Sequence, residues 1–173
     1  MSISIEIVHD ITEDGNLNEA QQYIVEEFRE YKANSLAASQ DNFCTPNEET
    51  DQRENASLHP FFGRDRIFDF PKRILAQIWH ENLAHIHIDT DGEWEVPSFQ
   101  WFTTSRNALI YSAFIHDDDY VFVVLDILND FDDSDNRGAH NYYSEEDIKH
   151  FLELAEWHRI NYPHEEQFIL QAP

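Results

Sequence analysis

The sequence AHIHI at residues 84–88 places His85 and His87 two positions apart. Its strict alternation of apolar and polar residues is typical of a half-buried β-strand, in which both imidazoles leave the same face with Cβ atoms roughly 6–7 Å apart. Two imidazoles at that spacing can act as a general base and a general acid, or as two ligands of one metal ion. Two half-exposed histidines without a chemical role fit the pattern equally well.

A second concentration of reactive groups is the sequence FFGRDR at residues 61–66. Arg64 and Arg66 follow a glycine, and a guanidinium group can hold a phosphate through two parallel hydrogen bonds. The same arginines can instead pair with Asp65 or Asp69 in a solvated turn. The sequence leaves both interpretations open.

Single residues extend these two groups. His140 stands just before the last predicted helix and is a further candidate acid or base. Trp101 and Phe102 can stack on nucleic-acid bases, although aromatic residues in such an aromatic-rich chain are more often part of the core. Arg106 can contact a phosphate. The lone cysteine, Cys44, excludes a disulfide framework and a multi-cysteine zinc site, and it is interpreted as an inert thiol.

The chain has 11 Lys plus Arg against 35 Asp plus Glu, a net charge of −24. Such a field repels phosphate backbones and argues against non-specific binding of nucleic acid by the surface as a whole. The charge is unevenly distributed: residues 1–60 and 117–173 carry −10 and −12, whereas residues 61–116 carry only −2. A site for an anionic ligand is therefore expected in the middle third.

Hydrophobic periodicity predicts the elements that must position these groups. We expect an α+β fold: an antiparallel meander sheet, with an N-terminal strand and helix and a C-terminal helix packed on it. Ser144 followed by three acids marks the start of the last helix. The strands are expected near residues 3–7, 83–89, 99–104, 108–116 and 120–128, and the helices near residues 17–34, 71–79 and 144–162.

The length of 173 residues predicts one domain over residues 1–163, followed by a short tail at 164–173. Residues 35–60 are mostly polar and show no periodicity, so we expect a mobile loop insertion there, with a short helical turn near residues 47–54. The longest apolar run covers only residues 121–125, and the N-terminus lacks the pattern of a signal peptide. These features predict a cytoplasmic protein without a membrane segment.

Taken together, these segments resemble the YafO family of toxins from bacterial type II toxin–antitoxin pairs. The resemblance runs in order over about residues 60–160. Its most specific part is FGRD followed closely by AHIHI. The matching pieces are residues 62–65, 84–88, Gln100 with 103–105, 109–111 and 123–128, together with His140, His150 and residues 155–156.

The resemblance implies a ribosome-dependent mRNA interferase with a RelE/ParE-like fold, neutralised by a cognate antitoxin. Metal-independent RNA cleavage needs an activated 2′-hydroxyl, a stabilised phosphorane and a protonated 5′-oxygen. His85 and His87 would then be base and acid, Arg64 would stabilise the developing charge, and no cofactor is expected. His140 would be a reserve acid or base, and the substrate-binding residues would be Arg66, Arg106 and Trp101.

Two other classes of function stay open. The acidic surface could mimic nucleic acid and block a basic protein partner, in which case the histidines need no role. Alternatively His85, His87 and His140 could together ligate one metal ion, since three histidines form a known zinc arrangement.

Overall fold

Five strands form one sheet in the computed structural model, which describes residues 4–44, 49–89, 92, 94, 99–128 and 142–163. The strand order is β1-β5-β4-β3-β2. His140, the acidic stretch 130–138 and the tail 164–173 lie outside the described residues. The strands are β1 (Ser4–His9), β2 (Phe62–Ile67), β3 (Ala84–Ile88), β4 (Ala108–His116) and β5 (Asp119–Leu128); the α-helices are α1 (Glu19–Ala38), α2 (Glu49–Glu54), α3 (Leu75–His80) and α5 (Glu145–Asn161).

The α+β class is confirmed, but the expectation of a purely antiparallel meander was wrong, because the sheet is mixed. Strands β2 to β5 are antiparallel neighbours, whereas β1 runs parallel to β5 at the far edge. Alternating isoleucines predict a strand but do not choose its neighbour. The strand expected at 99–104 was also wrong, since Gln100–Phe102 forms a 3₁₀ turn, η3.

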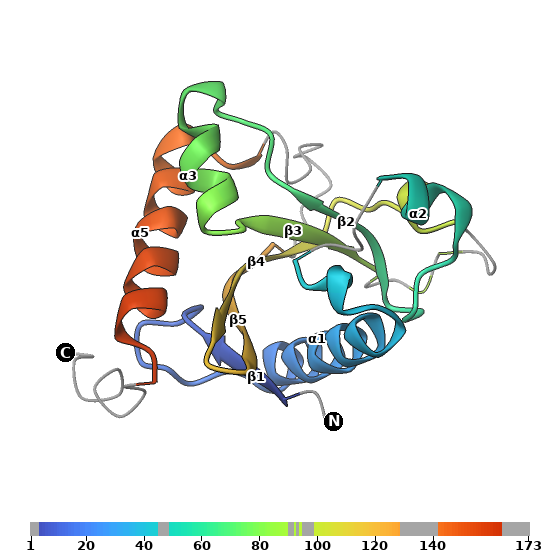
Figure 1. The fold of residues 1–173 in the computed structure, drawn as a ribbon, viewed down its shortest axis with the longest axis horizontal. Coiled ribbons are helices and arrows are strands. Elements are labelled where there is room, and N and C mark those ends of the chain that lie inside the picture. Colours follow the sequence, from blue (N-terminus) through green and yellow to red (C-terminus); the bar gives the residue numbers. More distant parts are fainter. Residues whose placement is uncertain are drawn as a thin grey trace.

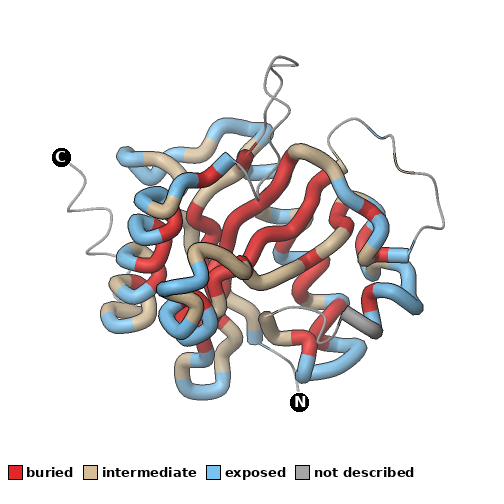
Figure 2. Tube along the Cα trace, turned by 90° about the horizontal axis from the view of Figure 1, so that it is seen from above, coloured by how far each residue is buried: buried red, intermediate tan, exposed pale blue. Residues whose placement is uncertain are grey.

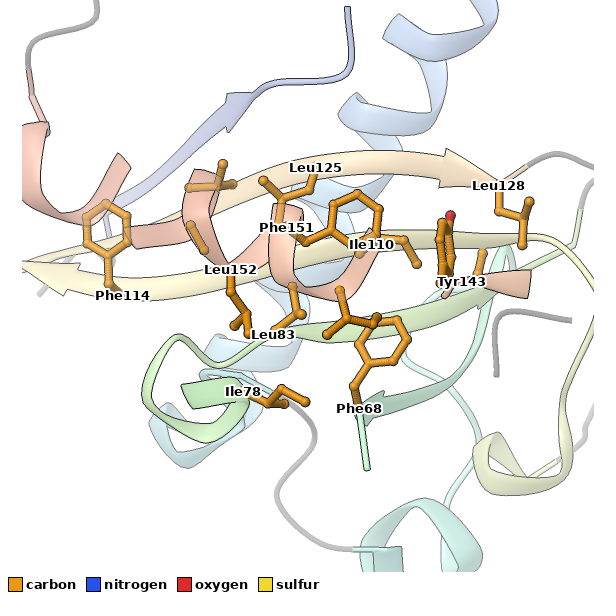
Figure 3. Packing of buried hydrophobic residues seen from close by; sticks show 14 of the residues in the cluster. Phe68, Ile78, Leu83, Ile110, Phe114, Leu125, Leu128, Tyr143, Phe151 and Leu152 are labelled. Atoms are coloured by element: carbon orange, nitrogen blue, oxygen red, sulfur yellow. The ribbon is translucent and has the colours of Figure 1, made fainter. Parts of the chain in front are cut away.

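Helices cover both faces of the sheet: α1 lies on one face, and α3 and α5 lie on the other (Figure 1). The central strands are buried along most of their length, and the exposed residues gather on the outer faces of the helices (Figure 2). Each face has its own apolar core. The core under α3 and α5 includes Phe68, Ile78, Ile110, Val123 and Phe151 (Figure 3); the core under α1 includes Phe28, Tyr31, Ile86, Tyr111 and Phe122.

The long helices begin where their sequences predict. Asn18 and Gln21 form a reciprocal capping box at the start of α1, and Ser144 and Asp147 form another at the start of α5. Each pair satisfies backbone donors that the first turn of a helix leaves unpaired. α1 is longer than expected, because it continues to Ala38 into the polar segment 35–60.

The polar segment 35–60 is therefore more structured than a simple loop. After the last turn of α1 come the 3₁₀ turn η1 (Gln40–Asn42) and the short helix α2, which lies where a helical turn was expected. α2 packs against η3 beside the edge strand β2 (Figure 1). This arrangement brings part of the insertion next to the FGRD segment.

Candidate functional site

Strand β2 sends side chains to both faces of the sheet, and its residues belong to two different environments. Asp65 pairs with Ile86 and faces α1, whereas Arg66 pairs with His85 and faces the other way. The register shifts between Phe62 and Asp65, which marks a bulge. The strand was not predicted, because its three consecutive charged residues were interpreted as a turn.

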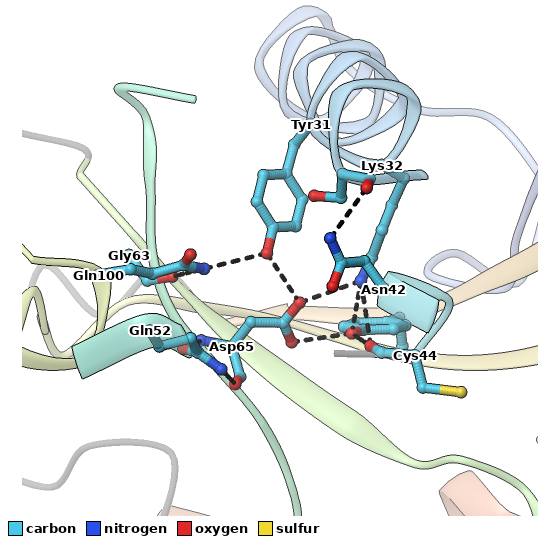
Figure 4. Close-up of polar contacts among 10 residues, drawn as sticks. Tyr31, Lys32, Asn42, Cys44, Gln52, Gly63, Asp65 and Gln100 are labelled. Atoms are coloured by element: carbon cyan, nitrogen blue, oxygen red, sulfur yellow. Dashed lines mark hydrogen bonds and ion pairs between the residues drawn. The ribbon is translucent and has the colours of Figure 1, made fainter. Parts of the chain in front are cut away.

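On the α1 face, Asp65 is the centre of a buried polar network (Figure 4). Its carboxylate accepts hydrogen bonds from Lys32 Nζ at 3.0 Å and from the hydroxyls of Tyr31 at 3.0 Å and Tyr111 at 2.8 Å. Lys32 Nζ also donates to the carbonyl oxygen of Cys44 at 3.0 Å. The network thus connects α1, β2, β4 and the segment that follows η1.

The side chains of this network have no contact with solvent, so their ionisation is governed by burial. Burial lowers the pKa of the Lys32 amine and raises the pKa of the Asp65 carboxyl, and the opposite charge of each partner works against both shifts. Burial and the nearby carboxylate raise the pKa of Tyr31 and Tyr111 far above the usual value, so both hydroxyls stay protonated and donate. Burial also raises the pKa of the nearby Cys44 thiol to about 12, which agrees with an inert thiol.

The backbone of Asp65 is held as firmly as its side chain. Gln52 of α2 donates to the Asp65 carbonyl at 2.7 Å and accepts from the Asp65 amide at 3.1 Å. Gln100 of η3 donates to the Gly63 carbonyl at 2.9 Å and to the Tyr31 hydroxyl at 3.0 Å. These amide side chains bind α2 and η3 to the outer edge of β2.

Gly63 allows this close approach of η3 to β2. A Cβ atom at residue 63 would stand 2.2 Å from the carbonyl oxygen of Thr103, which accepts the Arg64 amide, and 2.9 Å from the ring of Trp94. No side chain fits there unless the two backbones separate.

We therefore expect Gly63→Ala to lower the free energy of unfolding by about 3 kcal/mol, the upper part of the range for overpacking, because backbone must move. Urea denaturation of the purified variant measures the loss. Gly15→Ala is the comparison, since Gly15 has a positive φ of 72° but open space around it, and about 1 kcal/mol is expected there. Equal losses at the two positions would contradict the packing argument.

Three arginines surround one tryptophan at the sheet edge, and we call Arg53, Arg64, Arg66 and Trp101 the arginine–tryptophan cluster. The guanidinium carbons of Arg64, Arg53 and Arg66 lie 4.4, 4.9 and 5.9 Å from the centre of the Trp101 ring. Arg64 Nε also donates to the Trp101 carbonyl at 2.5 Å. Cations over an indole face are attracted to its electrons, so Trp101 holds the three positive charges together.

The expected pairing of an arginine with Asp69 is also present. Arg66 binds Asp69 at 2.7 Å, and both side chains are partly exposed. Asp65, in contrast, pairs with Lys32 rather than with an arginine. Arg106 lies beyond η3, between Ser105 and Asn107, and is half-buried. The Trp101 ring is in contact with these arginines, and its stacking on a nucleic-acid base stays a prediction.

The half-buried strand expected at residues 84–88 was wrong, because all five residues of β3 are buried, His85 and His87 included. His85 is fully enclosed, with its ring 4.7 Å from that of Phe68, and His87 is 5% exposed. The two rings share one face, as the alternation predicts, with their centres 5.6 Å apart. The Ser105 carbonyl oxygen lies 2.7 Å from His87 Nδ1, and the Ser105 amide lies 3.2 Å from it. The Ser105 carbonyl can therefore accept a hydrogen bond from a protonated Nδ1, and the Ser105 amide can donate one to an unprotonated Nδ1.

Comparison with protein families places this arrangement in context. The family model described as toxin YafO of type II toxin–antitoxin systems matches residues 29–159. The chain belongs to the YafO toxin family. Comparisons with curated proteins and with solved structures gave no significant match. Membership of a type II family implies a cognate antitoxin for this toxin.

The YafO match covers all the groups described above and leaves out β1. It begins within α1 just before Tyr31 and Lys32, and it ends at Arg159 in α5. The buried network, the arginine–tryptophan cluster and both strand histidines all fall inside it. None of the helices in the described part of this YafO-family toxin is both long and apolar enough to cross a membrane.

Within the described residues of the toxin, one group combines three possible metal ligands: Glu27, Glu30 and His59. His59 Nε2 lies 2.9 Å from Glu27, and its Nδ1 accepts the Phe61 amide at 3.1 Å. An accepting Nδ1 carries no proton, so the neutral ring has its proton on Nε2, facing Glu27. The group is thus explained as a hydrogen bond that fastens the start of β2 to α1.

Sequence reasoning on the YafO segments missed the most heavily bonded residue. Asp65 was considered as a possible partner of an arginine and as part of the FGRD match, Tyr31 was expected only on the apolar face of the helix near residues 17–34, and Lys32 was not considered. A lysine on the apolar face of α1 was the available signal, because a lysine is almost never fully buried unless it is paired. Arg53 was missed because it lies in the segment expected to be a loop.

Proposed function

We propose that this YafO-family toxin is an endoribonuclease that cleaves mRNA, that it acts on the translating ribosome in the cytoplasm, and that its cognate antitoxin holds it inactive. The observation that carries the proposal is the arginine–tryptophan cluster. In a chain of net charge −24, three guanidinium groups converge on one indole at the edge strand β2, whose neighbour β3 bears His85 and His87. A RelE/ParE-like relationship of the fold is part of the same proposal.

The proposed reaction is transfer of the scissile phosphate to the neighbouring 2′-hydroxyl. A base removes the 2′-hydroxyl proton, the 2′-oxygen bonds to phosphorus, and the bond from phosphorus to the 5′-oxygen breaks while an acid protonates that oxygen. Arg64 and Arg66 supply fixed positive charge where the phosphorane becomes more negative. The reaction requires no metal ion and no cofactor.

Among the histidines, His87 is the better placed to exchange a proton, because Ser105 supports both states of its Nδ1. His85 is enclosed and acts through His87, whose ring it touches. His140 is proposed as the second acid or base. Trp101 and Arg106 complete the substrate-binding set, with Trp101 orienting the arginines.

Burial of the two histidines is an observation that favours a different function. A toxin whose imidazoles stay enclosed cannot exchange protons with RNA, and the acidic surface would then act by binding a basic partner. Under that alternative the chain arrests growth without cutting RNA.

The test is inducible expression in bacteria, with growth and intact mRNA followed together. The wild-type toxin should arrest growth and produce cut mRNA, and the purified toxin should cut mRNA in a translation extract even after treatment with a chelator that is then removed. Arg64→Ala should lower the cleavage rate on the order of 10²-fold, as expected for one donor to the transition state. Arg64→Lys should recover part of the loss, because an ammonium group cannot hold two phosphate oxygens in a fixed fork.

Arg73→Ala is the matched control, since it removes the same charge from an exposed side chain that pairs with Glu145, the first residue of α5, outside the arginine–tryptophan cluster. It should cleave at the wild-type rate. Growth arrest with intact mRNA would refute the nuclease proposal and support the binding alternative. Equal effects of Arg64→Ala and Arg73→Ala would refute the role of the cluster.

A further inference from the structure

Two exposed aromatic rings stand beside the arginine–tryptophan cluster and are not explained by the fold. Phe99, the residue just before the turn η3, is 53% exposed, and Phe102, the last residue of η3, is 58% exposed. The guanidinium carbon of Arg53 lies 5.4 Å from the centre of the Phe102 ring and 4.9 Å from the centre of the Trp101 ring, so it is close to both rings. An exposed ring next to a cation is a typical stacking surface for nucleic-acid bases.

The segment that carries these rings is held in place by α2. The backbone amide of Gln100 donates to the carbonyl oxygen of Asn55, just after α2, at 2.9 Å. Ala56 and Phe99 form an isolated antiparallel bridge. The Thr103 hydroxyl donates to the Phe99 carbonyl at 2.9 Å. Phe102 and Arg53 are therefore presented from fixed backbone, which lowers the entropy lost when a ligand binds.

We propose that Phe102 and Arg53 form a stacking site for an unpaired RNA base next to the scissile phosphate. The inference rests on the proposed nuclease function and names the chemistry of its substrate: single-stranded RNA, because a base inside a duplex shows no open face. Phe102 takes the base, since Trp101 is already in contact with three guanidinium groups. Arg53 contacts either the edge of the base that stacks on Phe102 or the adjoining phosphate.

Charge supports RNA as the occupant of this surface. Three of the 11 Lys and Arg residues of the chain have their guanidinium carbons within 6 Å of the centre of the Trp101 ring. Residues 1–60 and 117–173, by contrast, are strongly negative overall. A phosphate chain would be attracted to this edge and repelled elsewhere, so the strand is directed along the cluster. Stacking adds affinity that does not depend on the base sequence.

The probe is a fluorescently labelled 2′-O-methyl oligoribonucleotide of mixed sequence, which is single-stranded and lacks the 2′-hydroxyl that the proposed cleavage requires. Anisotropy titration gives its Kd at several salt concentrations. Phe102→Ala and Phe102→Leu should each weaken binding by roughly 5- to 150-fold, the range for loss of one stacked base, and Phe102→Trp should retain it. Arg53→Gln should weaken binding and reduce the slope of log Kd against log salt by about 0.7 if it contacts one phosphate.

Trp79→Ala is the matched control, because Trp79 is an aromatic residue of α3 that is 60% exposed and lies away from the cluster. It should bind the oligoribonucleotide as the wild type does. The inference is overturned if the wild type does not bind the probe, if Phe102→Leu binds as tightly as the wild type, or if Phe102→Ala loses the antitoxin but not RNA. Binding that depends on Phe102 without any mRNA cleavage would support the stacking site and refute the nuclease proposal.

Discussion

Asp65→Ala is expected to lower the free energy of unfolding by about 3–5 kcal/mol, a large part of the 5–15 kcal/mol that stabilises an ordinary domain. The variant leaves the Lys32 ammonium group in a fully buried position without its carboxylate. It also removes the carboxylate that accepts from Tyr31 and Tyr111, although the Tyr111 hydroxyl keeps the Cys44 carbonyl as an acceptor. A buried charge that loses its partner keeps its desolvation cost and loses the attraction that offset it. Urea denaturation followed by circular dichroism measures the loss.

Asp69→Ala provides the control, because Asp69 pairs with Arg66 at the surface and its side chain is 46% exposed. A surface pair contributes about 0–1 kcal/mol, so this variant should unfold close to the wild type. The double variant Lys32→Met/Asp65→Leu should regain part of the stability, since it removes the unpaired charge. If Asp65→Ala were no less stable than Asp69→Ala, the buried network would not hold the fold together.

His87→Gln is expected to reduce the rate of the proposed mRNA cleavage by about 10²- to 10⁴-fold, the usual contribution of a general acid or base. Glutamine keeps the polar character and similar length but cannot exchange a proton near neutral pH. The rate is measured in a translation extract with purified toxin. A circular dichroism melt is recorded alongside it, because His87 is buried and a loss of folding must be distinguished from a loss of chemistry.

His80→Gln makes the same substitution at an exposed side chain at the end of α3 and should leave the rate unchanged. A native His87→Gln protein that cleaves at the wild-type rate would remove the histidine from the mechanism. The arginines would then be the remaining catalytic groups, and the buried histidine pair would have only a packing role.

Much of the fold is readable from the sequence because the signals are local. Alternating residues mark β3, and the serine with three following acids marks the start of α5; both elements were predicted within one or two residues. The direction of β1 was missed because strand pairing depends on contacts far apart in the chain. β2 was missed because its charged residues face two environments, one filled by α1 and one by η3.

The candidate site was predicted only in part for a related reason. Composition showed that residues 61–116 are nearly neutral, and the cluster does lie mostly there. Arg53, however, comes from a different third of the chain and reaches Trp101 only because Gln52 fastens α2 to β2. The burial of His85 was not foreseen, since Phe68, which covers it, follows β2 and not β3. Which side chain covers a buried residue depends on tertiary packing, and the spacing of residues in the sequence does not reveal it.

The position of β1 affects when the toxin can fold during its own synthesis. β1 lies at the sheet edge and pairs with β5, the last of the described strands to be made, and α1 packs on Phe122 and Val124 of that strand. Lys32 of α1 likewise cannot donate its hydrogen bond to the Tyr111 hydroxyl until β4 has been made. A nascent chain therefore leaves its first helix unpacked until residues 119–128 have been made, because the contacts that reward folding are distant in sequence.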